Sequence, residues 1–159
     1  MSIRGIAGVD QSKMAITGGT ASNLVMDGSN TIAGASAAQL PTTLFVLRGA
    51  NLVATADQLF SKVANFTNYV LTDVIAVTKS GGATVACVGG IYTAAAKVGD
   101  QIVSAVQSWI GLSSIGLTVR AALANLLLKI ETAIPFLSLT TGSATAATAD
   151  LFLIGLIAD

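Results

Sequence analysis

The sequence predicts an all-β protein, an antiparallel β-sandwich of the jelly-roll type with an extended N-terminal arm. Three observations lead to this prediction. Short apolar runs recur at a spacing of roughly 8–12 residues with turn residues between them, a pattern typical of sandwiches and barrels. Glycine pairs at 18–19, 81–82 and 89–90 mark several of these turns. The composition also changes near residue 43, which divides the chain into an arm, 1–42, and a body, 43–159.

The arm is rich in Gly, Ala, Ser and Thr and contains no aromatic residue. Gly18-Gly19 and Asp27-Gly28 are steps of the kind found in hairpin turns. Such a segment buries too little apolar area to fold alone, so we expect it to become ordered against a neighbouring molecule. The apolar side chains expected to make that contact are Met14, Ile16, Leu24, Val25, Met26 and Ile32.

The body is expected to form its strands within residues 43–53, 68–78, 84–95, 135–141 and 149–158. In the second of these, alternation places Tyr69, Leu71, Ile75 and Val77 on one face. Asp73 falls on that same face. A carboxylate among apolar neighbours needs a partner or solvent, so we expect Asp73 at an edge, at an interface or in a hydrogen-bonded pocket.

Two stretches leave helix and strand open, so the prediction allows one or two short helices. Apolar residues recur at helical spacing in 102–110 and again in 119–130. The second stretch is also rich in Ala and Leu, which favour helices. Gly111 and Gly116 interrupt the pattern between them.

The C-terminal strand is apolar on both faces. Leu151, Leu153 and Ile157 alternate with a second apolar set, Phe152, Ile154 and Leu156. One face of each strand in a two-layer sandwich is expected to be polar, so the outer face here needs a cover. A sister subunit is the simplest cover, which predicts a homo-oligomer. The candidate interface residues are Asp73, Phe152, Ile154 and Leu156.

The charge pattern argues against nucleic-acid and membrane partners. Eight basic and eight acidic residues give a net charge of zero, and the basic residues are scattered singly. Only 10% of residues are charged and 53% are hydrophobic, whereas soluble domains are typically about 25% charged. The longest uncharged runs, 101–119 and 132–149, contain too many polar residues or a proline for a spanning helix. No signal peptide is expected, because no sustained apolar stretch follows the first residues.

The residues offer no catalytic signature, and we expect no enzyme activity, cofactor, metal or small-molecule substrate. The chain has no histidine and one cysteine, Cys87, which we interpret as a small buried hydrophobe. The carboxylates stand singly along the chain, and the phosphate-binding patterns GxxxxGK[ST] and GxGxxG do not occur.

Several motifs resemble those of small virion structural proteins of tailed bacteriophages. They are "KMAITGGTASNL", "GANLVATADQLF", "NYVLTDVIAV", "GGIYTAAAKVGDQIV" and "LSLTTGSATAATADLFLIG". The chain departs from the pattern at Val98, where glycine is expected, and at Leu151-Phe152, where a polar-aromatic pair is expected.

The resemblance implies a capsid decoration (cement) protein, made in the bacterial host cytoplasm and located on the capsid surface of the virion. It would form a homotrimer and bind the major capsid protein through its arm. A short head- or tail-fibre or adaptor component is the alternative. A generic oligomeric binding module and a membrane-active small protein are the non-viral alternatives.

Overall fold

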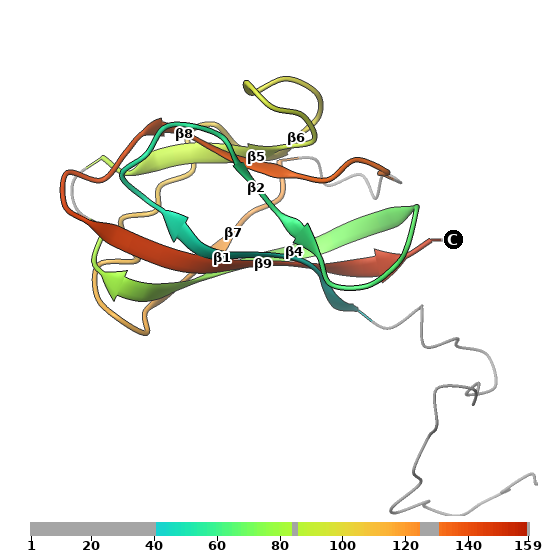
Figure 1. The fold of residues 1–159 in the computed structure, drawn as a ribbon, viewed down its shortest axis with the longest axis horizontal. Helices are drawn as coiled ribbons and strands as arrows, with labels where there is room; N and C mark the ends of the chain where they lie inside the picture. The colour runs from blue at the N-terminus through green and yellow to red at the C-terminus, as the bar shows by residue number, and fades with distance from the viewer. Residues whose placement is uncertain (1–40, 84–85, 125–130, 159) are drawn as a thin grey trace, which may run out of the picture. The chain divides into compact units, whose positions relative to one another are not determined.

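A computed structural model describes residues 41–83, 86–124 and 131–158. These residues form nine strands in two antiparallel sheets. The first sheet has the order β3 (Ser61–Lys62), β1 (Thr42–Asn51), β9 (Ala147–Ile157), β4 (Tyr69–Gly81) and β7 (Thr118–Ala121). The second has the order β2 (Gln58–Leu59), β8 (Phe136–Thr141), β5 (Val88–Tyr92) and β6 (Gln101–Val103). Figure 1 shows the two sheets as stacked layers.

The predicted all-β sandwich is therefore confirmed. Each of the five segments expected to contain a strand contains one, namely β1, β4, β5, β8 and β9. The two long strands β4 and β9 pair along nearly their whole length at the centre of the five-stranded sheet. Because these long strands pair with β1 and β7 on either side, the outward side chains of the five-stranded sheet form one continuous face.

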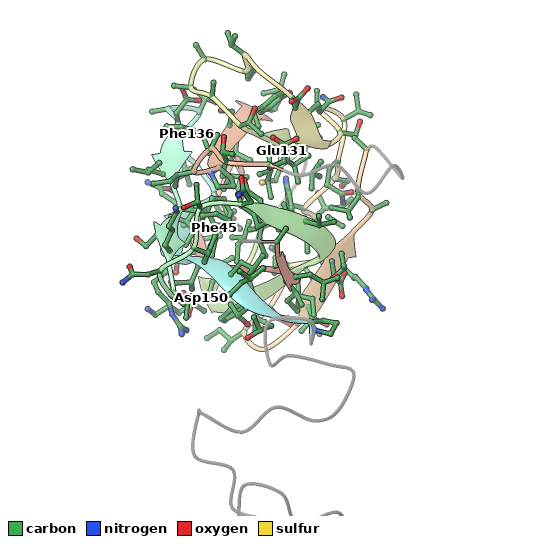
Figure 2. All side chains as sticks on the ribbon, turned by 90° about the vertical axis from the view of Figure 1, so that its right-hand side faces the viewer. Phe45, Glu131, Phe136 and Asp150 are labelled. Atoms are coloured by element: carbon green, nitrogen blue, oxygen red, sulfur yellow. The ribbon has the colours of Figure 1, made fainter. Side chains whose placement is uncertain are left out.

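Alternate side chains of the two sheets meet between the layers and form the core. On β9, Leu151 and Leu153 are fully buried. Phe45, Phe66 and Tyr69 pack edge to face with ring centroids 4.8–5.7 Å apart. Figure 2 shows Phe45 between the layers, whereas Asp150 lies on the outer side of the five-stranded sheet. Each sheet thus has an inner and an outer face with different side chains.

The helical interpretation of 102–110 and 119–130 is wrong wherever the structure describes these stretches. The first begins in β6 and continues through turns, and the second begins in β7. Residues 125–130 lie outside the described residues. The apolar residues at helical spacing do not share one buried face, because Trp109 is buried whereas Val106 and Ile110 are exposed. Trp109 instead donates its backbone N–H to the Cys87 carbonyl (2.8 Å), so the chain runs beside β5 rather than coiling.

The predicted faces of β4 also need a correction. The register of β4 against β9 shifts between Leu71 and Asp73, which marks a β-bulge. Before the bulge, Tyr69 and Leu71 point into the core. After it, Ile75 and Val77 point outward, because the extra residue reverses the alternation. The four residues therefore do not share one face, and Asp73 lies on the outward side.

Candidate functional site

The outward side of the five-stranded sheet, here called the outer face, carries a stripe of half-buried apolar side chains. Phe152 on β9 lies between Val46 on β1 and Ile75 on β4. Ile154 follows on β9, opposite Asp73. The outer face comprises Val46, Val70, Ile75, Val77, Phe152, Ile154 and Leu156. The sheet register thus brings together side chains from three strands.

Ion pairs flank this stripe at two places. At the end near Val77, Arg48 binds Asp150 (3.0 Å), and Lys79 lies 3.9 Å from the same carboxylate. Along the β7 edge of the sheet, Arg120, which pairs with Ile75, binds Asp73 (2.7 Å). The carboxylates are largely covered, with side-chain exposures of 17% for Asp150 and 14% for Asp73, whereas Arg120 is 76% exposed. The outer face therefore presents cations to its surroundings.

The environment of Asp150 favours its ionised form. Partial burial alone would raise the pKa of this carboxyl group. The Gly49 amide donates to it (2.7 Å) and Arg48 donates to it as well, and with the charge of Lys79 these contacts hold the pKa below its ordinary value. The carboxylate links β1, β9 and β4, because its oxygens accept hydrogen bonds from β1 and lie close to the Lys79 ammonium group on β4.

Two shallow hollows lie beside these ion pairs. One, of about 280 Å³, is lined by Val77, Thr78, Lys79, Asp150 and Phe152. The other, of about 350 Å³, is lined by Thr72, Asp73 and Arg120 together with residues 121–123. Both are open depressions rather than enclosed cavities, so they suit a protruding side chain of another protein better than a small molecule.

The structure brings the four predicted interface residues together. Phe152, Ile154 and Leu156 all lie on the outer face, and Asp73 lies beside Ile154 in the same sheet. Asp73 has the partner that the sequence required, Arg120. Their role in an oligomer stays a prediction. The arm residues Met14, Ile16, Leu24, Val25, Met26 and Ile32 lie outside the described residues.

A second apolar surface was missed by the sequence analysis. Residues 104–117, here called the β6–β7 ridge, run from the edge of one sheet to the edge of the other. Val106 and Ile115 on it are 79% and 71% exposed, and Ile110 and Leu117 are also exposed. The signal was the uncharged run 101–119, which was considered as a membrane segment or, over 102–110, as a helix or strand, and not as a contact surface. The polar residues that disqualified it for lipid are compatible with a protein-contact surface.

The β6–β7 ridge is held firmly by what lies beneath it. Trp109 is completely buried, and its indole N–H donates to the Gly89 carbonyl (3.0 Å). Leu112 is also completely buried, and its carbonyl accepts from the Ala83 amide (2.8 Å). The exposed aliphatic side chains thus project from a segment with fixed anchors, which lowers the entropy lost on binding.

A third feature is the junction around Asp57. Its carboxylate accepts hydrogen bonds from the Ser138 hydroxyl on β8 and from the Ala96 amide in the β5–β6 turn. Ala96 and Lys97 both have left-handed φ values, 59° and 61°, which are strained for residues other than glycine. That turn projects from the four-stranded layer (Figure 1). Asp57 therefore stabilises a strained turn by joining it to two other segments.

We expect the Asp57→Asn variant to melt at a lower temperature than the wild-type chain at pH 7. Hydrogen bonds from Ser138 and Ala96 and the charge of Lys97 hold the pKa of Asp57 below its ordinary value, against a smaller effect of burial. Near pH 4 the unfolded chain therefore binds more protons at this site. The wild-type advantage should be complete above that pH and disappear as the pH falls through the lower pKa of the folded state.

Thermal melts of both chains between pH 7 and pH 2.5 measure this difference. As a control, Ser138→Ala should cost less stability in the Asp57→Asn background than in the wild type, because the two residues share one hydrogen bond. A difference between the two chains that is independent of pH would show that the Asp57 charge has no stabilising role.

The polar groups that could bind a metal or act as a nucleophile were also considered in the described residues. Cys87 is buried, and burial raises the pKa of its thiol. Among residues 41–83, 86–124 and 131–158, no three His, Cys, Asp or Glu side chains gather where they could hold a metal ion. No helix in the described part of the chain is long and apolar enough to span a membrane.

Comparison with known proteins does not add to this account. No protein-family model, curated protein or solved structure matches the chain.

Proposed function

We propose that the chain is a non-enzymatic structural protein of a phage virion, a capsid decoration protein that binds major capsid subunits and stabilises the head. In this proposal it forms a homo-oligomer, a trimer, on the capsid surface after synthesis in the host cytoplasm. The observation that carries the proposal is the outer face, an apolar stripe whose neighbouring carboxylates are already paired. Together with the phage-like sequence motifs, it supports a protein that acts by covering and joining surfaces.

The physical mechanism needs no reaction chemistry. Burial of apolar area stabilises a contact by roughly 25 cal/mol per Å², and the pairs Arg48–Asp150 and Arg120–Asp73 reduce the cost of desolvating the two carboxylates. In the proposed particle, the outer face joins copies of the chain, and the arm attaches each copy to the capsid through backbone pairing and its apolar side chains. An oligomer that carries several arms is retained more strongly than one arm alone allows.

The proposal predicts that residues 1–42 are needed for attachment and dispensable for the folding of residues 43–159. Capsids prepared without the protein would be mixed with the full chain or with the truncated chain, and bound protein and heat resistance measured. The full chain should bind and raise the temperature at which the capsids open. The truncated chain should melt within a few degrees of the full chain and bind poorly.

Two results would contradict this prediction. If the truncated chain fails to fold, the arm belongs to the body or to the core of the oligomer. If it folds and decorates capsids normally, attachment depends on the sandwich alone. Binding of the full chain to tails rather than to capsids would favour the alternative, a fibre or adaptor component.

A further inference from the structure

We propose that the β6–β7 ridge of one copy of the chain docks on the outer face of the next copy. This inference rests on the proposed homo-oligomer and names the two surfaces that form its interface. A cyclic trimer needs such a pair, because each subunit in a ring larger than a dimer uses two different patches. The ridge and the outer face are two such apolar surfaces among the described residues.

Repulsion between like charges favours this pairing over contact between two outer faces. The outer face presents Arg48, Lys79 and Arg120, all well exposed, and two such faces would oppose cations with cations. The β6–β7 ridge belongs to the stretch 101–119, which contains no charged residue. The ridge can therefore approach the outer face without electrostatic repulsion, and no charged side chains of the ridge have to be desolvated.

The shapes of the two surfaces also agree. The ridge projects aliphatic side chains, with Val106 and Ile115 the most exposed. The outer face offers the hollow of about 280 Å³ beside Val77 and Phe152, large enough for a branched aliphatic side chain. Because Trp109 anchors the ridge, the projecting side chains are held in place before binding.

The positions of the two surfaces suit a closed ring. The ridge joins β6 to β7, which are the edge strands of the two sheets, so it lies on the side of the sandwich that adjoins the outer face. A heterologous contact forms a ring only when each copy is rotated relative to the next and the rotation closes. Docking between two adjoining sides of the sandwich supplies such a rotation. The exposed side chains of the ridge offer on the order of 400 Å² of apolar area, about half of what one partner of a standard interface buries.

The test uses two variants of the full chain, each altered on one surface. The ridge variant is Val106→Ser with Ile115→Ser, and the face variant is Val77→Asp, which puts a charge in the hollow. Both changes are on outward side chains, so folding should be retained and is checked by thermal melts. In sedimentation velocity, self-association of each variant should weaken by about 100-fold or more. The control, Val63→Ser with Val98→Ser, removes exposed side chains elsewhere and should leave the oligomer intact.

Mixing the two variants gives the decisive result. The ridge variant keeps an intact face and the face variant keeps an intact ridge, so an equimolar mixture should form a one-to-one complex that neither variant forms alone. If Val77→Asp fails to fold, Phe152→Ser replaces it in the same experiment. Variants that fold, stay monomeric and do not combine would overturn the inference, as would a ridge variant that still forms the wild-type oligomer.

The outcomes separate this inference from the proposed function. A complex in the mixture supports the ridge-to-face contact even if the wild-type chain does not bind capsids, which would contradict only the decoration role. A wild-type chain that is monomeric at micromolar concentration would overturn the inference and the proposed trimer together.

Discussion

Replacing Trp109 by alanine is expected to reduce the free energy of unfolding by about 4 kcal/mol, because it empties the largest buried side-chain position. The change also leaves the Gly89 carbonyl, which accepts the indole N–H, without this partner. For a body of this size, the melting temperature should fall by roughly 15 °C. Thermal melts followed by circular dichroism at one fixed protein concentration measure the effect.

Two further variants separate the effect of the lost volume from that of the lost hydrogen bond. Trp109→Phe keeps much of the ring volume but loses the hydrogen bond, so it should lose about 1–2 kcal/mol. Ile110→Ala changes the exposed neighbour and should alter the stability little. A Trp109→Ala chain that melts within 3 °C of the wild type would show that the ridge is not anchored as described.

The second large effect is expected at Gly89. A Cβ atom at this position would lie 2.6 Å from the Ser138 carbonyl oxygen and closer still to the Leu139 Cα, both backbone atoms of the neighbouring strand β8. Backbone atoms in a paired strand cannot move aside cheaply, so Gly89→Ala should lose more than about 3 kcal/mol or fail to fold. Urea denaturation of the purified variant measures the loss.

Gly116 provides the matched control. It has a positive φ of 83°, but no atom lies within 4 Å of an added Cβ, so Gly116→Ala should cost only the backbone strain of about 1–2 kcal/mol. If Gly116→Ala proves more damaging than Gly89→Ala, the close approach of β5 and β8 is not the reason for glycine at position 89.

The sandwich was predictable because alternation and turn residues act locally. β9 illustrates this: Leu151 and Leu153 point inward and Phe152 and Ile154 outward, as the alternation in the sequence requires. The outer face followed from the same pattern, since a strand that is apolar on both sides needs cover on both.

The features that were not predicted depend on contacts between distant residues. The bulge before Asp73 is visible only as a shift of register against β9, and one extra residue reversed the faces of Ile75 and Val77. The spacing in 102–110 matched a helix, but its apolar residues do not share one face: Ile102 and Trp109 are buried, whereas Val106 is exposed. Whether such a stretch forms a helix or a strand depends on the segments it pairs with, and the local spacing of apolar residues does not reveal those partners.

The junction at Asp57 shows the same limit. The sequence presents Asp57 as an isolated carboxylate, whereas its partner Ser138 lies 81 residues away. The β6–β7 ridge was hidden for a different reason: exposure of an apolar residue cannot be read from its type. The sequence pattern therefore indicates that each strand has an inward and an outward face. Contacts between distant residues decide which side chains lie on each face and which apolar side chains stay exposed.

For the virion protein that we propose, the deciding measurement is its position in purified particles. Electron cryo-microscopy of particles with and without the gene for this chain would be compared as difference maps. The decoration role predicts trimer-sized density on the outer surface of the capsid that disappears when the gene is deleted. Difference density confined to the tail, or no density in any part of the particle, would contradict it.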